Sequence, residues 1–402
     1  MAASSTSAEA HLDANGVKCV SLAVDFAGDS RDGDLKAVVQ ALCGWEAGAT
    51  ITLTVISGGI TNLLFKASSE GKDDVLVRVF GAKTEMMIDR QRDNLLFHKL
   101  AEAGFGPTMY GYFDNGRIEG WFPSAALEPS QMGQREPVDF VGLIARELAR
   151  MHSLQIEDDR TPTLWGQLDK WLAQAQALDF KGPGETAKAE KFAGLDVAWI
   201  ASELEVLRAA LPSPLNDHGA KLVGAVVGDD PASAGKRAAR EAMFSIVFCH
   251  NDLLSGNVLA LAGDSSRVQI IDFEYGGYNY AGFDIGNHWC EYAGFDFDLD
   301  KWYPSHAAGE AFLKEYLAAR SPGVVEAVQA AVGPDGAEEA TTAFWAEAVA
   351  VSQHFSLASH FFWGLWAIIQ AKHSPIDFDF MQYAVDRFGG YKKQQPAFAP
   401  TA

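Results

Sequence analysis

The sequence predicts an α+β protein with a small lobe, built on a mixed antiparallel sheet, and a larger, mainly helical lobe. Short β-branched runs separated by turn residues fill residues 50–122, with one long helical pattern among them. From Trp302 onward the pattern is almost entirely helical. A chain of 402 residues is long enough to bury the core of such a protein. We expect a flexible tail at 1–18, a small lobe at 19–122 and a large lobe at 123–402.

The small lobe is predicted from five strand-like segments and one helix. The strands occupy residues 51–56, 63–67, 74–80, 108–113 and 117–122, and the helix occupies about 84–103. Gly58-Gly59 and Asn115-Gly116 are turn signals that join neighbouring strands into hairpins. This order of elements is that of the small lobe of protein kinases, with the nucleotide expected between the two lobes.

The large lobe begins with two predicted helices, over 138–152 and 164–178. A low-complexity segment follows at about 212–242, and it is interpreted as a surface insertion. After it, Phe244–Cys249 has the pattern of a strand. This strand leads directly into the most informative motif of the chain.

That motif is His250-Asn251-Asp252, followed by Asn257 and, twenty residues after Asp252, by Asp272. Protein kinases use H-R-D-L-x-x-x-N and then D-F-G at similar spacing. Phosphoryl transfer requires a carboxylate that orients and deprotonates the alcohol, and oxygen ligands that hold Mg²⁺ on the phosphates of ATP. Asp252 fits the first role, and Asn257 and Asp272 fit the second. Asn251 in place of the Arg, and Glu274 in place of the Gly, favour a kinase of small molecules.

A nucleotide site also needs groups that hold phosphate and adenine. The glycine-containing hairpin lets the backbone approach an anion closely, and a single arginine occupies the strand where protein kinases have their lysine. The end of the last small-lobe strand is expected to meet adenine through its backbone. The residues predicted at the nucleotide are Ser57, Gly58, Gly59, Thr61, Asn62, Arg78, Glu119 and Trp121.

Composition excludes several other classes of protein. The formal net charge of −21 disfavours nucleic acid and anionic lipid as partners. The four cysteines show no CxxC pairing and indicate reduced thiols in a cytoplasmic protein. The most apolar stretch, 355–369, is shorter than a membrane span, and the N-terminus lacks the pattern of a secretory signal. We therefore expect no membrane insertion.

Several segments of the chain resemble the choline/ethanolamine kinase family, and its ethanolamine kinase branch most. They are SGGITN, VLVRVFGAKTE, HNDLLSGN, IDFEYGGYNYAGFDIGNHWCEYAGF and SLASHFFWGLWAIIQAKHSPIDFDFMQYAVDRF, and the resemblance spans about residues 50 to 392. It implies a protein-kinase-like two-lobe fold and transfer of the ATP γ-phosphate to the hydroxyl of ethanolamine. That reaction is the first step of phosphatidylethanolamine synthesis by the CDP route.

The resemblance also implies residue roles at the amino alcohol. It places Asn251 near the hydroxyl, and around the ammonium it places Tyr275, Glu291, Trp363, Trp366 and Tyr383. A carboxylate and aromatic faces are the groups that suit a small cation. On the small-lobe helix, Asp93 stands where the family has a Glu, which leaves open whether it pairs with Arg78.

Substrate preference has alternatives at this stage. A primary ammonium needs hydrogen-bond acceptors that a quaternary ammonium does not, and Asp377 and Asp379 are candidates for them. A choline or dual-specificity kinase is the alternative within the enzyme class. A catalytically silent kinase-like sensor of nucleotide or amine is the alternative outside it, although intact Asp252, Asn257 and Asp272 argue against it. The resemblance leaves a homodimer open.

Overall fold

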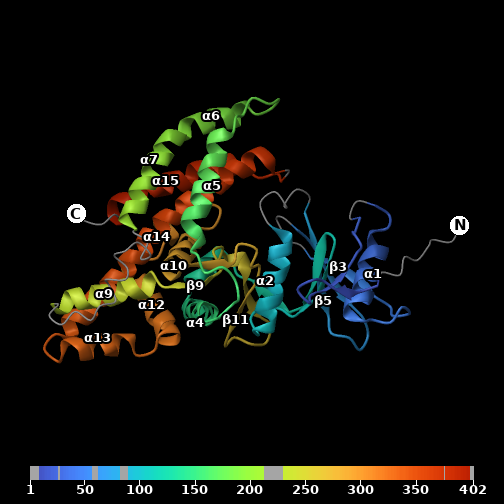
Figure 1. Ribbon diagram of the computed structural model, residues 1–402, viewed down its shortest axis with the longest axis horizontal. Helices are drawn as coiled ribbons and strands as arrows, with labels where there is room; N and C mark the ends of the chain where they lie inside the picture. The colour runs from blue at the N-terminus through green and yellow to red at the C-terminus, as the bar shows by residue number, and fades with distance from the viewer. Residues whose placement is uncertain are drawn as a thin grey trace. The chain divides into compact units, whose positions relative to one another are not determined.

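The chain divides into two compact units in the computed structural model, which describes residues 9–25, 28–56, 62–81, 89–211, 230–374 and 376–398 (Figure 1). The first unit comprises Met1–Ser124 together with Ile271–Glu274, and the second comprises Ala125–Ile270 and Tyr275–Ala402. The short segment 271–274 belongs to the first unit through Phe273, whose ring packs against the rings of Phe97 and Phe105.

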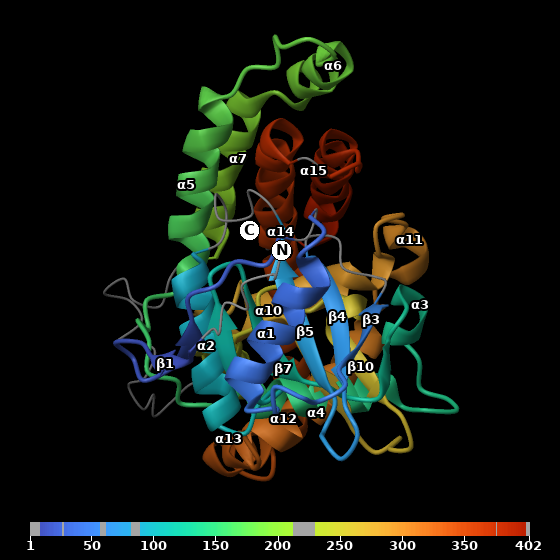
Figure 2. The ribbon, with the colours of Figure 1, turned by 90° about the vertical axis from the view of Figure 1, so that its right-hand side faces the viewer.

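The first unit is built on a seven-stranded sheet with the order β1-β2-β6-β7-β5-β4-β3. Strands β5, β4 and β3 lie side by side in Figure 2. Neighbouring strands are antiparallel except β2 and β6, which are parallel. The strands are β1 (His11–Leu12), β2 (Lys18–Val20), β3 (Thr52–Ile56), β4 (Asn62–Ser68), β5 (Val75–Phe80), β6 (Met109–Phe113) and β7 (Gly116–Gly120).

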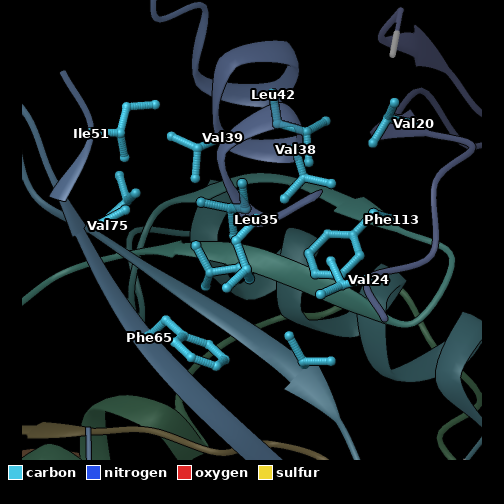
Figure 3. Packing of buried hydrophobic residues seen from close by; sticks show 14 of the residues in the cluster. Val20, Val24, Leu35, Val38, Val39, Leu42, Ile51, Phe65, Val75 and Phe113 are labelled. Atoms are coloured by element: carbon cyan, nitrogen blue, oxygen red, sulfur yellow. The ribbon is translucent and has the colours of Figure 1, made fainter. Parts of the chain in front are cut away.

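Two helices accompany this sheet, α1 (Arg31–Cys43) and α2 (Arg90–Glu102). Helix α1 buries apolar residues at positions i, i+3, i+4 and i+7, which form a single helical face. This face packs on side chains of the sheet and makes the core of the unit (Figure 3). Asp89 caps the N-terminus of helix α2, and its carboxylate accepts hydrogen bonds from the backbone N–H groups of Gln91 and Arg92.

The second unit is mainly helical. Its helices are α3 (Pro129–Met132), α4 (Phe140–His152), α5 (Thr163–Ala177), α6 (Thr186–Leu195), α7 (Val197–Ala210), α9 (Pro231–Met243), α10 (Ala281–Cys290), α11 (Leu299–Trp302), α12 (His306–Arg320), α13 (Val324–Val332), α14 (Ala337–His373) and α15 (Phe380–Phe398), with the 3₁₀ turns η2 (Ser255–Asn257) and η3 (Glu291–Ala293). Two small sheets have the orders β11-β10-β8 and β12-β9. Their strands are β8 (Ser124–Ala126), β9 (Ile246–Cys249), β10 (Val258–Leu261), β11 (Val268–Ile270) and β12 (Gly277–Tyr280).

The long helix α14 is the centre of the second unit, packing against α9, α10 and α15. Figure 2 shows α14 and α15 side by side. Two glycines of α10 bring that helix close to α14: a Cβ at Gly282 would lie 2.6 Å from the Phe355 ring, and one at Gly286 would lie 2.4 Å from the Ser352 carbonyl oxygen. The side chains that flank Gly286 can therefore reach side chains of α14.

Two regions differ from the expectation. Residues 11–12 and 18–20, partly within the expected tail, form strands β1 and β2. In the expected insertion, 212–229 lie outside the described residues, but 231–243 form helix α9, capped by Asp230 and packed on α14. The packing explains the helix, because Gly235 lets α9 approach the α14 backbone. None of the helices in the described parts of the chain is long and apolar enough to cross a membrane.

Candidate active site

In the first unit, the arginine predicted to contact phosphate is part of a buried ion-pair network. Arg78 of β5 lies directly opposite Arg117 of β7, and Glu119 separates their charges. Its Oε1 accepts hydrogen bonds from Arg78 Nε at 2.8 Å and from Arg117 Nε at 2.7 Å. Burial alone would raise the pKa of Glu119, but the two guanidinium groups lower it below its usual value. Glu119 is therefore a buried anion.

This contact gives the side chain of Glu119 a structural role. Strand β7 lies between β5 and β6, and the side chain of Glu119 is only 2% exposed. The side chain belongs to the ion-pair network, and the contact of this residue with adenine stays a prediction. The ion pairs could not be predicted, because a β-strand pattern does not show which charges face each other.

The helix carboxylate Asp93 belongs to the same network. Its Oδ2 accepts from Arg117 Nη1 at 2.8 Å and from Arg90 Nη1 at 3.2 Å, and Arg90 Nη1 also lies 3.2 Å from Glu274 Oε2. Arg78 pairs with Glu119 instead of Asp93. Asp93 thus pairs with Arg117 and Arg90, and not with Arg78, the partner that the sequence had left open.

Asp272 also lies beside Arg78 in the first unit, with Oδ2 3.5 Å from Arg78 Nη1. Its other oxygen, Oδ1, is buried and accepts no hydrogen bond from the residues that the structure describes. The backbone of Asp272 is left-handed, with φ of 66°, a conformation that costs energy for a residue other than glycine. A strained carboxylate with an unused buried oxygen fits a metal ligand.

The remaining predicted nucleotide residues are only partly visible. Ser57, Gly58, Gly59 and Thr61 lie outside the described residues, whereas Asn62 is buried at the start of β4. Trp121 follows β7, and Lys66 Nζ lies 5.3 Å from the centre of its ring. The phosphate loop and the role of Trp121 therefore stay predictions.

In the second unit, the loop after β9 holds the predicted base. Asn257, in the turn η2, donates through Nδ2 to the backbone oxygen of Asp252 at 2.8 Å and to its Oδ2 at 3.3 Å. His250 Nδ1 accepts from the Asp252 backbone N–H. These contacts orient the Asp252 carboxylate and leave the Asn257 Oδ1 as an oxygen donor of the kind that Mg²⁺ prefers.

Asp284 of α10 clamps the backbone of this loop. Its Oδ2 accepts from the His250 N–H at 2.7 Å and its Oδ1 from the Asn251 N–H at 2.8 Å. His152 is bonded to Asp284 Oδ2 and to the hydroxyl of Tyr316. Burial would raise the pKa of Asp284, but His152 and the backbone donors hold it below its usual value. Asp284, His152 and Cys249 are close enough to ligate a metal, yet these hydrogen bonds account for both oxygens of Asp284.

Asn251 was predicted near the substrate hydroxyl, and the structure gives it different contacts. Its Nδ2 donates to the Tyr275 carbonyl, and its Oδ1 accepts from Asn279 Nδ2. The residue is 1% exposed, with a left-handed backbone (φ 63°). These neighbours engage the side chain of Asn251 and support the catalytic loop, whereas its place near the substrate hydroxyl stays a prediction.

The predicted aromatic residues form one wall in the second unit. The ring of Trp363 is 5.3 Å from Tyr275 and 5.4 Å from Trp366, measured between centroids, and both pairs are edge-to-face. Trp366 Nε1 donates to the Tyr275 hydroxyl at 2.9 Å. Trp363 and Trp366 come from α14, and Tyr275 precedes β12, so segments almost ninety residues apart build this wall.

Glu291 and Tyr383 are held together by a buried arginine that the sequence analysis missed. Arg387 Nη1 donates to Glu291 Oε1 at 3.0 Å and to the Tyr383 hydroxyl at 3.1 Å. The guanidinium lies over the ring of Phe297, another residue with a left-handed backbone (φ 55°). Burial raises the pKa of Tyr383, and the charge of Asp252 is among the further causes. The negative charge of the predicted base therefore acts on Tyr383.

Comparisons with known proteins show the family of this chain. A model of the choline/ethanolamine kinase family matches residues 53–392. The chain belongs to the choline/ethanolamine kinase family. A protein named "Probable ethanolamine kinase" from Arabidopsis thaliana is 36% identical over 345 residues, covering 85% of this chain and 79% of the relative. "Choline/ethanolamine kinase" of Mus musculus is 32% identical, covering 86% of this chain and 80% of the relative.

Solved structures support the fold of this choline/ethanolamine kinase family member. An ethanolamine kinase from Plasmodium vivax matches with a TM-score of 0.69 and 24% identity, covering 94% of this chain and 92% of that one. A choline kinase from Cryptosporidium parvum matches with a TM-score of 0.62 and 23% identity, covering 86% of this chain and 89% of that one. The predicted protein-kinase-like fold, a sheet unit plus a mainly helical unit, is confirmed.

Several supporting residues of this family member were absent from the sequence prediction. Asp284 and Asn287 stand three residues apart in a mostly apolar helix, so they share one helical face. That spacing is a signal that could have found them. Arg387 has no comparable signal, because nothing local distinguishes it from a surface arginine. Asp379, considered as an extra acceptor for the ammonium, caps α15 and pairs with Lys191.

Proposed function

We propose that this protein is an ethanolamine kinase, which transfers the γ-phosphate of ATP to the hydroxyl of ethanolamine. Its membership in the choline/ethanolamine kinase family and its likeness to relatives named ethanolamine kinase support this function. The observation that carries the proposal is the joint presence, in the second unit, of the Asp252 loop, a wall of aromatic residues and the buried carboxylate Glu291.

The wall supplies what an amino alcohol needs at its nitrogen. Tyr275, Trp363, Trp366 and Tyr383 offer aromatic faces for cation–π contact. One oxygen of Glu291 accepts a hydrogen bond from Arg387, and its other oxygen is an acceptor suited to an ammonium N–H. A primary ammonium has three N–H donors, so it gains from such an acceptor more than a quaternary ammonium does. This difference favours ethanolamine over choline.

Asp252 is proposed as the base that orients the substrate hydroxyl and accepts its proton as the phosphoryl group is transferred. The hydrogen bond from Asn257 orients that carboxylate, and Asp284 fixes the loop that carries it.

Asn257 and Asp272 are proposed as ligands of Mg²⁺, on the strength of their sequence spacing, the oxygen donors they offer and the unused buried oxygen of Asp272. Bound Mg²⁺ would neutralise the charge of the ATP phosphates. Arg78 is proposed to assist at the phosphates. A cytoplasmic location is proposed as well, in keeping with four free cysteines.

The test of the function is an assay of purified protein with ATP and Mg²⁺, in which ethanolamine and choline are supplied separately. We expect phosphoethanolamine as the main product, detected by ³¹P NMR, with kcat/KM higher for ethanolamine than for choline. Turnover of choline alone would overturn the substrate assignment. Absence of turnover with either alcohol would favour a nucleotide or amine sensor.

Asp252→Asn tests the base. We expect kcat to fall by about 10²–10⁴-fold, because the amide keeps the shape of the side chain but cannot accept the proton. ATP binding, measured by calorimetry, should persist. Nearly unchanged turnover in this variant would show that another group is the base.

A further inference from the structure

Asn287 of α10 joins the catalytic loop to the aromatic wall through three hydrogen bonds. Its Nδ2 donates to the backbone oxygen of Asn251 at 3.2 Å, on the residue before Asp252. Its Oδ1 accepts from Trp363 Nε1 and from Ser359 Oγ, each at 2.7 Å. Asn287 is fully buried, so none of these bonds competes with water.

The connection continues from Ser359 to the charged end of the wall. Arg387 Nη2 donates to Ser359 Oγ at 2.6 Å and to its backbone oxygen at 3.1 Å, while Nη1 of the same guanidinium holds Glu291 and Tyr383. One chain of hydrogen bonds thus runs from the backbone beside the base, through Asn287, to the groups proposed to receive the ammonium.

We propose that Asn287 is a positioning residue that sets the separation between the base and the ammonium site, and thereby selects amino alcohols with two carbons between nitrogen and oxygen. The inference rests on the proposed function, because it assigns the wall to the amine and Asp252 to the hydroxyl. Asn287 contacts neither end of the substrate. It acts through Asn251 on one side and through Trp363 and Ser359 on the other.

Chain length is the property that such a connection controls. With the nitrogen held at the wall, one extra methylene displaces the hydroxyl by about 1 Å, and a misplacement of that size can cost roughly a hundredfold in rate. The rate falls in this way only if the wall and the loop cannot move apart. A buried side chain bonded to both prevents that movement.

The experiment compares ethanolamine with 3-aminopropan-1-ol in the full-length protein and in Asn287→Ser. The readout is the ratio of the two kcat/KM values. Serine is too short to bridge Asn251, Trp363 and Ser359 together. We expect the preference for ethanolamine to fall at least tenfold, with KM for ethanolamine raised and with turnover of the longer alcohol retained or increased.

Asn279→Ser is the matched control. Asn279 is also a fully buried asparagine, and its side chain bonds to Asn251 Oδ1 and to the backbone N–H of Tyr280. We expect Asn279→Ser to lower kcat for both alcohols by the same factor, so that the ratio stays within about twofold, well below the penalty of a misplaced reacting atom. An equal loss for both alcohols in Asn287→Ser would overturn the proposal and leave Asn287 a purely structural residue.

If Asn287→Ser fails to fold, as judged by circular dichroism, Ser359→Ala decides. It removes the hydroxyl between Asn287 and Arg387, while Arg387 keeps the backbone oxygen of residue 359. A fall of the ratio by threefold or more supports the proposal, and an unchanged ratio overturns it. If the unaltered protein phosphorylates neither amino alcohol, the proposed function itself fails, which is a different result from an unchanged ratio.

Discussion

In the first unit, three arginines and four carboxylates share one largely buried network, made of Arg78, Arg90, Arg117, Asp93, Glu119, Asp272 and Glu274. In the second unit, asparagine amides, a serine hydroxyl and an indole N–H support the site together with two buried charged groups, Asp284 and Arg387.

The difference matches what each unit is proposed to hold. Phosphates carry several negative charges, so a permanent cation such as Arg78 suits them. A small amino alcohol must be held at a defined distance from a base, and directional hydrogen bonds set such distances. The two networks should also differ in how much stability a single substitution removes, because a buried charge without a partner destabilises the fold more than a buried amide without one.

The largest expected effect on stability is that of Glu119→Gln. The substitution leaves Arg78 and Arg117 facing each other without the carboxylate between them, so we expect the free energy of unfolding to fall by about 3–5 kcal/mol. Urea denaturation measures it. The control is Glu46→Gln, which removes an exposed partner of Lys72 in the same unit and should leave stability unchanged. A loss no larger than that of the control would show that the network is not held by charge.

Acid is expected to destabilise the second unit through its buried histidines. Burial lowers the pKa of His288 from 6.5 to about 4, and burial together with Arg387 lowers that of His360 to about 3. The unfolded chain binds these protons below about pH 6.5, whereas the folded chain does not. Stability is therefore lost as the pH falls from 6.5 toward 4, by on the order of 3 kcal/mol for each histidine.

His360→Leu checks this expectation, because it removes one of the two groups. The unfolding free energy of the variant should depend less steeply on pH between 6.5 and 4 than that of the unaltered protein. Equal slopes in the two proteins would contradict a role for His360 in acid sensitivity.

The smallest effect is expected from a change of packing without charge. Gly286→Ala adds a methyl group that would meet the Ser352 carbonyl and the Ser356 nitrogen of α14, and overpacking of this kind costs about 1–3 kcal/mol. Gly389→Ala, on an exposed face of α15 with open space around it, should stabilise the protein by roughly 0.5–1 kcal/mol. Thermal unfolding distinguishes the two. A neutral Gly286→Ala would show that α10 and α14 can separate.

Much of the first unit could be predicted from the chain, because its strands and turns follow local patterns. The expected segments correspond to β3–β7 and α2 in order, with ends shifted by a residue or two where the described residues allow comparison. Helix α9 could not be predicted in this way. Its sequence is rich in small residues, and packing against α14 stabilises it.

In the candidate site, too, some residues could be predicted from local patterns and others could not. Motif spacing alone indicated Asp252, Asn257 and Asp272, since the roles of base and metal ligand require specific side chains. The partners of Glu119, Asn251 and Asp93 could not be read in advance, because each depends on which residues of distant segments face one another.

By itself, the sequence determined the family of this protein, the order of most of its strands and helices, and the side chains able to carry out phosphoryl transfer, because these follow from residue type and short-range spacing. Tertiary structure alone decided which charges neutralise Arg78, that Asp284 clamps the catalytic loop, and that Asn287 connects this loop to the aromatic wall. Those contacts join residues far apart in the chain, and they form only when glycines such as Gly286 let the helices pack closely.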